Sequence, residues 1–259
     1  MRFGLCTGLE HQEAAVAAGY DYLEPSVTGT LRPELPEAEI LPPLLAELAA
    51  SSIRPEAYNV LLPGDLKVVG PNADAGRQEQ YLNAAFRRAS ALGGEIVVFG
   101  SGGSRRVPED WPLADAHFQI VAFLRRCGKA AERHSITVAI EPLNVSECNF
   151  INRVAEAVHL AEEVGSPAVA VLSDLYHVAH DGQSYDETRE AAPLLRHVHV
   201  AGLDRRGPVA ADHEFLRGYF VVLKQIGYAG RVSIEANWSD VAAQAAEARE
   251  VVQRAWDDA

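Results

Sequence analysis

The chain of 259 residues has few cysteines and no long apolar run, and both absences exclude classes of protein. Cys6, Cys127 and Cys148 are an odd number without paired spacing, so we expect buried free thiols rather than disulfides or a CxxC zinc site. No stretch reaches the ~18 apolar residues of a membrane span, and the N-terminus lacks the pattern of a secretory signal. The sequence therefore predicts a cytoplasmic protein that does not bind membranes.

Basic residues are also scarce, with 23 lysines and arginines against 36 acidic residues and a formal net charge of -13. No basic stripe is visible that would offset this charge, so we expect no nucleic acid partner. No G-x-G-x-x-G pattern opens a helix after a strand near the N-terminus. The GSGGS segment from Gly100 lacks the lysine of a P-loop, so a flexible loop is predicted there instead of a nucleotide site.

Short apolar runs alternate with longer segments of helical period, which is typical of βα units around a parallel sheet. Eight strands are predicted, starting at Arg2, Tyr20, Arg54, Glu95, Thr137, Ala168, Leu195 and Arg231. The predicted helices begin near Glu10, Glu37, Gly76, Leu113, Arg153, Tyr185, Asp212 and Asp240. Eight such units could also form an open sheet, but the length is close to the ~250 residues of one TIM barrel. We expect residues 1–259 to form a single domain, a (β/α)8 TIM barrel.

The last four predicted strands each end in a side chain that can bind a metal. These residues are Glu141 in VAIEP, Asp174 in VLSD, His199 in HVHVA and Glu235 in VSIEAN. In a closed barrel the C-terminal ends of the strands converge on one face. Each residue alone has an ordinary explanation, such as a helix cap or a structural histidine. Three carboxylates together in one buried site would repel each other without a cation, so the sequence predicts one divalent metal ion.

The predicted ligand set is rich in oxygen, with three carboxylates and one imidazole. Such a set suits Mn²⁺ or Mg²⁺ and accepts Co²⁺, whereas structural zinc sites prefer cysteine and histidine. Manganese is the expected metal, and Mg²⁺, Co²⁺ and Zn²⁺ remain compatible with these ligands.

The segments around the four ligands resemble the xylose isomerase-like superfamily. They are IEPLNVSECNF from Ile140, SDLYH from Ser173, HVHVAG from His197 and SIEANW from Ser233. The pattern is similar to that of the sugar isomerases and epimerases in this superfamily, and it extends over essentially the whole chain. The motif is specific for the superfamily and weak for the substrate.

The resemblance implies roles for individual residues. Glu141 and Glu235 match the paired glutamates that bind metal and exchange protons, while Asp174 and His199 match the remaining ligands. The same resemblance implies three substrate-binding residues, Glu147, His177 and Arg205, although ordinary pairing would also explain them. It also implies a small sugar or keto-acid substrate and leaves a homo-oligomer possible.

These features favour a metal-dependent sugar isomerase or epimerase that works through an enediolate. A metal-dependent dehydratase or lyase of the same superfamily, and a sugar-binding barrel without catalysis, are the alternatives. The related endonuclease IV proteins carry metal-binding histidines on the third and fourth strands, where this chain has Tyr58, Asn59, Phe99 and Ser101. Because those histidines are absent, a DNA-repair function is disfavoured.

Several other residues near the expected mouth have two interpretations. Glu24 is expected either to contact a substrate hydroxyl or to pair with a neighbouring arginine. Arg105 and Arg106 are expected to lie in a solvated loop, with an anion site as the alternative. Asp212 and His213 are expected to begin a helix. For each aromatic residue, stacking on a sugar and ordinary packing are both compatible with the sequence. The aromatic candidates are Phe3, Tyr58, Trp111 and Trp238.

Overall fold

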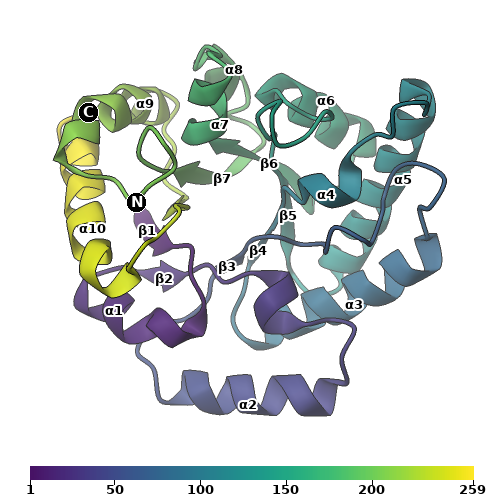
Figure 1. Cartoon of the computed structure of the whole chain (residues 1–259), viewed down its shortest axis with the longest axis horizontal. Coiled ribbons are helices and arrows are strands. Elements are labelled where there is room, and N and C mark those ends of the chain that lie inside the picture. The colour runs from purple at the N-terminus through teal and green to yellow at the C-terminus, as the bar shows by residue number, and fades with distance from the viewer.

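Eight parallel strands form the centre of the molecule in the computed structural model, which describes residues 1–259 (Figure 1). The strands are β1 (Arg2–Leu5), β2 (Tyr22–Leu23), β3 (Ala57–Tyr58), β4 (Ile96–Phe99), β5 (Thr137–Ile140), β6 (Val169–Asp174), β7 (Leu195–Val200) and β8 (Arg231–Ile234). Their spatial order is β2-β1-β8-β7-β6-β5-β4-β3, so the first and last strands are neighbours. Figure 1 shows this as the purple N-terminal strand among the last elements of the chain.

The remaining seam lies between β2 and β3, the two shortest strands. The backbone N–H of Leu23 donates to the carbonyl of Arg54 at 2.9 Å, and that of Glu56 donates to the carbonyl of Leu23 at 3.2 Å. These bonds join the edges of the sheet, so the strands form a nearly closed (β/α)8 barrel. This confirms the predicted fold class.

Helices surround the barrel (Figure 1). The α-helices are α1 (Gln12–Ala17), α2 (Glu37–Ala49), α3 (Ala75–Ala91), α4 (Gly102–Arg105), α5 (Leu113–Glu132), α6 (Val154–Val164), α7 (Leu175–His180), α8 (Asp186–Glu190), α9 (His213–Gln225) and α10 (Val241–Asp257). Three short turns of other helix types are η1 (Leu9–His11), η2 (Val27–Leu31) and η3 (Ala210–Asp212). The helix predicted near Asp212 is therefore confirmed. No helix combines the length and the apolar character needed to cross a membrane.

The third strand is shorter than expected from the apolar run that starts at Arg54. Val60 has a positive φ of 48°, a conformation that β-branched residues rarely adopt, and it turns the chain out of the extended region. The predicted flexible loop at GSGGS is also wrong in part, because Gly102–Arg105 forms one helical turn, α4.

The barrel interior follows from the two-residue period of strands, which places every second side chain on the same face. Six apolar residues line it: Tyr22, Ala57, Ile96, Val98, Ala139 and Leu172. Gly4 leaves room for the Tyr22 ring, because a Cβ at Gly4 would lie only 2.2 Å from that ring. Two positions beyond Leu172 and Ala139 come Asp174 and Glu141. The same alternation that packs the barrel therefore directs these carboxylates inward at its C-terminal end.

Candidate metal centre

The structure brings together the four predicted metal ligands at the C-terminal end of the barrel. Glu141 directly follows β5, Asp174 ends β6, His199 lies in β7 and Glu235 directly follows β8. One donor atom from each residue lies within 4.8 Å of the donor atoms of the other three. Glu141, Asp174 and His199 are buried, and Glu235 is half-buried.

Burial disfavours the negative charge of the carboxyl groups in this cluster. Burial and the neighbouring Glu235 raise the pKa of Glu141, and burial also raises the pKa of Asp174. Burial opposes the charge of Glu235 as well, but His199 and Arg205 lower its pKa to about 2. Desolvated carboxylates this close are stable as anions only beside positive charge. The donor set therefore fits a divalent cation held by carboxylate oxygens and an imidazole.

Cys6 lies near His199 but outside the four-residue cluster. Its sulfur is within 4.8 Å of donor atoms of Glu24 and His199, and this group does not include Glu141, Asp174 or Glu235. Burial raises the pKa of this thiol well above its usual value. All three cysteines are free and buried, which confirms the expectation for them.

Glycine and arginine position Glu141 from the neighbouring strand. A Cβ at Gly100, just after β4, would lie 2.1 Å from the Glu141 Oε2, so glycine there makes room for the carboxylate. The Arg105 guanidinium donates to the carbonyls of Glu141 at 2.8 Å and Phe99 at 3.1 Å. Arg105 is fully buried, so the expectation of a solvated loop is wrong for this residue, whereas its neighbour Arg106 is exposed.

Replacing Arg105 by methionine is expected to lower the free energy of unfolding by about 1–3 kcal/mol, because it leaves buried carbonyls without a donor. Arg106→Met is the matched control, and it is expected to change stability by less than about 0.5 kcal/mol since its side chain is exposed. Urea unfolding measures both. Equal losses in the two variants would contradict the role given to Arg105.

Buried polar side chains contact His199 on the side of its Nε2 atom. The carboxylate of Glu24, just after β2, accepts from His199 Nε2 at 2.8 Å and from His197 Nε2 at 2.7 Å. Glu24 is fully buried and has no arginine partner, so both earlier interpretations of Glu24 are wrong. The period of strand β7 puts His197 and His199 on the same face, a signal that could have identified this pair.

The three predicted substrate-binding residues also lie together, next to the four-residue cluster. The Arg205 guanidinium donates to Glu147 Oε1 at 2.8 Å and to Glu235 Oε2 at 2.7 Å. His177 Nε2 lies 3.6 Å from Asp174 Oδ2 and 3.4 Å from Arg205 Nη1. Arg205 has a positive φ of 59°, an uncommon conformation for a residue other than glycine. Arg205 therefore forms ordinary ion pairs and also lies next to the predicted metal ligands.

Three further residues at the mouth were not predicted as site residues. Asn144 Nδ2 donates to Glu147 Oε1 at 2.9 Å and lies 2.9 Å from His177 Nδ1. Asn59 Nδ2 donates to Glu235 Oε1 at 3.3 Å, and the Tyr176 ring lies 4.9 Å from the Arg205 guanidinium. These contacts hold the polar side chains in place.

Two of the aromatic candidates have no access to a ligand. Phe3 and Tyr58 are 2% and 0% exposed and belong to the hydrophobic core, so packing explains them. Trp111 and Trp238 are half-buried and pack against the same core.

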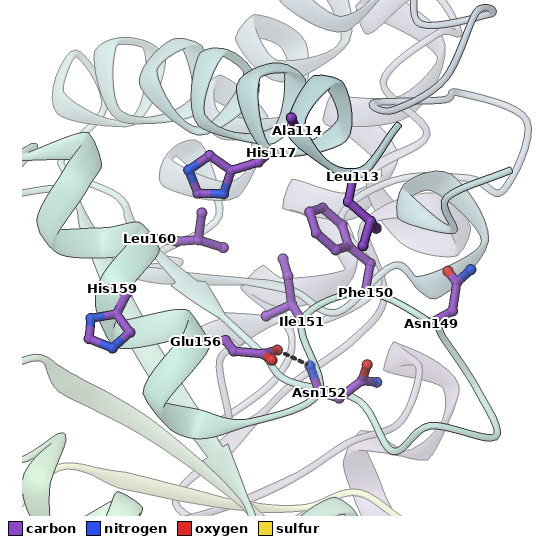
Figure 2. A pocket seen from close by; sticks show the side chains of 10 residues that line it. All are labelled: Leu113, Ala114, His117, Asn149, Phe150, Ile151, Asn152, Glu156, His159 and Leu160. Atoms are coloured by element: carbon purple, nitrogen blue, oxygen red, sulfur yellow. Dashed lines mark hydrogen bonds between the residues drawn. The ribbon is translucent and has the colours of Figure 1, made fainter. Parts of the chain in front are cut away.

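A cavity of about 540 Å³ lies away from this cluster, between α5 and α6. Figure 2 shows the side chains that line it, among them Leu113, His117 and Phe150, with the bond from the Asn152 backbone to Glu156 drawn as a dashed line. None of the seven predicted site residues lines it. The candidate site is therefore defined by its converging polar groups and not by the volume of this cavity.

Comparisons with known proteins find relatives among sugar epimerases and isomerases. An L-ribulose 3-epimerase of Mesorhizobium japonicum is 25% identical over 187 residues, which cover 71% of this chain and 63% of that protein. The chain thus spans less than two thirds of the length of that relative. A 2-oxo-tetronate isomerase of Cupriavidus necator is 24% identical over 200 residues, which cover 74% of this chain and 75% of that protein.

A solved D-allulose 3-epimerase from Methylomonas sp., in complex with D-allulose, has a TM-score of 0.82 at 20% identity, covering 98% of this chain and 96% of that one. This likeness is one of fold. The sequence model of the family described as xylose isomerase-like TIM barrel matches residues 12–255, nearly the whole chain. The chain therefore belongs to the xylose isomerase-like TIM-barrel family.

Proposed function

We propose that this protein is a divalent-metal-dependent isomerase or epimerase of a sugar, of the ketose class, or of a keto acid. The observation that carries the proposal is the position of Glu141 and Glu235, two glutamates from different strands whose carboxylates share one buried cluster with Asp174 and His199. The relatives named for epimerase and isomerase activity support the reaction class. In this proposal residues 1–259 act as a single domain.

In the proposed function, Glu141, Asp174, His199 and Glu235 hold one metal ion. The oxygen-rich donors make Mn²⁺ the first choice, with Mg²⁺, Co²⁺ and Zn²⁺ also compatible. A bound divalent cation supplies Lewis-acid stabilisation of the negative charge that develops on the substrate oxygens, an effect of several kcal/mol in a dry site.

The two glutamates perform the proton transfers in this mechanism. One carboxylate would remove the proton from the carbon beside the substrate carbonyl, which gives an enediolate. The other glutamate, which must start as the carboxylic acid, would return its proton to that carbon from the opposite face. Positioned acids and bases typically contribute ~10²- to 10⁴-fold each to the rate. The configuration of the substrate decides which glutamate acts first. A proton returned to the neighbouring carbon by the same base would instead interconvert an aldose and a ketose.

Glu147, His177 and Arg205 are proposed to bind the end of the substrate near its carbonyl. Arg205 bridges Glu147 and Glu235, so a substrate oxygen bound by the guanidinium would lie beside a proposed base. His177 is held by Asn144, whose backbone N–H also donates to His177 Nδ1 at 3.2 Å. This fixed set of polar groups would orient the substrate, which reduces the entropic cost of reaching a reactive geometry.

Metal binding is expected to release a proton and to strengthen as the pH rises. Burial opposes the charge of His199, but Glu24, Cys6 and Glu235 raise its pKa well above the usual value, so the metal-free imidazole carries the extra proton. A metal ion and this proton compete for the same nitrogen. Titration calorimetry with Mn²⁺ in two buffers of different ionisation enthalpy tests this. An enthalpy that is the same in both buffers, with an affinity independent of pH, would contradict it.

Product analysis tests the proposed reaction class. The protein, loaded with Mn²⁺, is incubated with a panel of ketoses, aldoses and hydroxypyruvate, and products are identified by chromatography and mass. An isomeric product of unchanged mass supports the proposal. Loss of one water would instead identify the dehydratase or lyase alternative, and saturable sugar binding without conversion would identify a non-catalytic barrel.

A further inference from the structure

The Glu24 carboxylate accepts three buried hydrogen bonds, and one of them comes from His199. Oε1 of Glu24 lies 2.8 Å from His199 Nε2, and Oε2 lies 2.7 Å from His197 Nε2. The Ser233 hydroxyl also donates to Oε2, and this hydroxyl lies 2.7 Å from the Tyr22 hydroxyl. All five side chains are buried inside the barrel. A buried carboxylate is costly unless such donors surround it, so this arrangement needs a reason beyond filling space.

The two ring nitrogens of His199 contact different groups. Nε2 faces Glu24, whereas Nδ1 lies 3.2 Å from Glu141 Oε1 and 3.5 Å from Glu235 Oε2. An ionised carboxylate only accepts hydrogen bonds, so Glu24 requires a proton on Nε2. In a neutral imidazole the other nitrogen then has a free lone pair. That nitrogen, Nδ1, is the atom that points to the proposed metal ligands.

We infer that Glu24 is a positioning residue, which holds the His199 ring and its tautomer so that Nδ1 is presented to the metal. The inference rests on the proposed function, since it concerns the same metal ion. His197 and Ser233 in turn fix Glu24, because they occupy its second oxygen and leave the first for His199. A carboxylate that binds the far nitrogen of a metal-ligating histidine typically contributes 10- to 100-fold to metal affinity or activity.

The variant Glu24→Gln tests this role with little change in volume. Glu56→Gln is the matched control, because Glu56 pairs with Arg231 at 2.7 Å at the N-terminal end of β8, the end opposite to Glu235. We expect Glu24→Gln to weaken Mn²⁺ binding by about 10- to 100-fold in titration calorimetry, whereas Glu56→Gln binds as the unchanged protein does. If Glu24→Gln folds and binds Mn²⁺ with unchanged affinity, the inference is wrong.

Nitrogen NMR of the unchanged protein gives a readout that does not depend on a variant folding. The protein is labelled with ¹⁵N at its histidines and loaded with Zn²⁺, which is diamagnetic. Its spectrum should show a proton on Nε2 of His199 and none on Nδ1. A proton on Nδ1 in the loaded protein would overturn the inference. If the unchanged protein binds neither Mn²⁺ nor Zn²⁺, the proposed function itself is wrong. If the unchanged protein and the Glu24→Gln variant bind the metal equally well, only the inference about Glu24 is wrong.

Discussion

Replacing Glu235 by glutamine is expected to reduce turnover by about 10²- to 10⁴-fold, the usual contribution of one positioned base. Glutamine keeps the size of the side chain and one oxygen, but it cannot take up the substrate proton. Burial opposes the charge of Glu235, but His199 and Arg205 lower its pKa, so this side chain is in the ionised form that a proton acceptor requires. Steady-state rates with the best substrate of the panel provide the measurement.

The control for this variant is again Glu56→Gln, which removes the same charge at the far end of the barrel. It is expected to leave turnover close to that of the unchanged protein. Full activity in the Glu235→Gln variant would contradict the two-base mechanism. A loss in both variants would indicate a general effect of charge removal on the fold.

Asp174→Asn is expected to weaken metal binding by more than ~100-fold, because it removes the negative charge of a proposed ligand. Loss of a residue that only contacts a ligand, such as Glu24, costs ~10- to 100-fold. Asparagine preserves the local structure, since Asp174 Oδ1 accepts from the backbone N–H of Tyr176 at 2.7 Å and an amide oxygen can do the same. The helix α7 should therefore stay in place. Calorimetry with Mn²⁺ measures the dissociation constant.

Activity of the Asp174→Asn variant should return in part when Mn²⁺ is raised, because neither proposed base has been removed. By contrast, extra Mn²⁺ should not restore the Glu235→Gln variant. An Asp174→Asn variant with an unchanged dissociation constant would remove Asp174 from the ligand set.

Much of the fold could be predicted from the sequence because its signals are local. The alternation of apolar runs and helical segments identified eight βα units, and α2 and α5 begin at the expected residues, Glu37 and Leu113. The short third strand could not be predicted, because it depends on the positive φ of Val60, which hydrophobic pattern does not reveal. The helix α7 could not be predicted either, because a loop after β6 would be equally compatible with the sequence. In the structure Asp174 caps the N-terminus of α7 immediately after this strand.

The site divides in a similar way. Glu141, Asp174, His199 and Glu235 share one visible feature, a polar residue at the end of an apolar strand, and the structure places them together. Arg105 gave no such signal, because its partners are backbone carbonyls that any sequence provides.

The contacts of Glu24 were also not predicted, although Glu24 directly follows β2, as Glu141 follows β5 and Glu235 follows β8. Its partners His197 and Ser233 come from strands β7 and β8, distant in sequence. Closure of the barrel, and not a local motif, brings these three residues into contact. The local pattern therefore predicted the four clustered residues, whereas the hydrogen bonds of Glu24 beneath them depend on the tertiary fold.

Deuterium incorporation from D₂O, followed by NMR across the panel of ketoses, aldoses and hydroxypyruvate, tests the central claim most directly. The assay is run with Mn²⁺ and again after chelation. The proposed mechanism predicts exchange of the proton on the carbon beside the carbonyl of at least one compound, and loss of that exchange when the metal is removed. Exchange that persists after chelation, or no exchange with any compound despite stoichiometric metal binding, would contradict a metal-dependent enediolate mechanism.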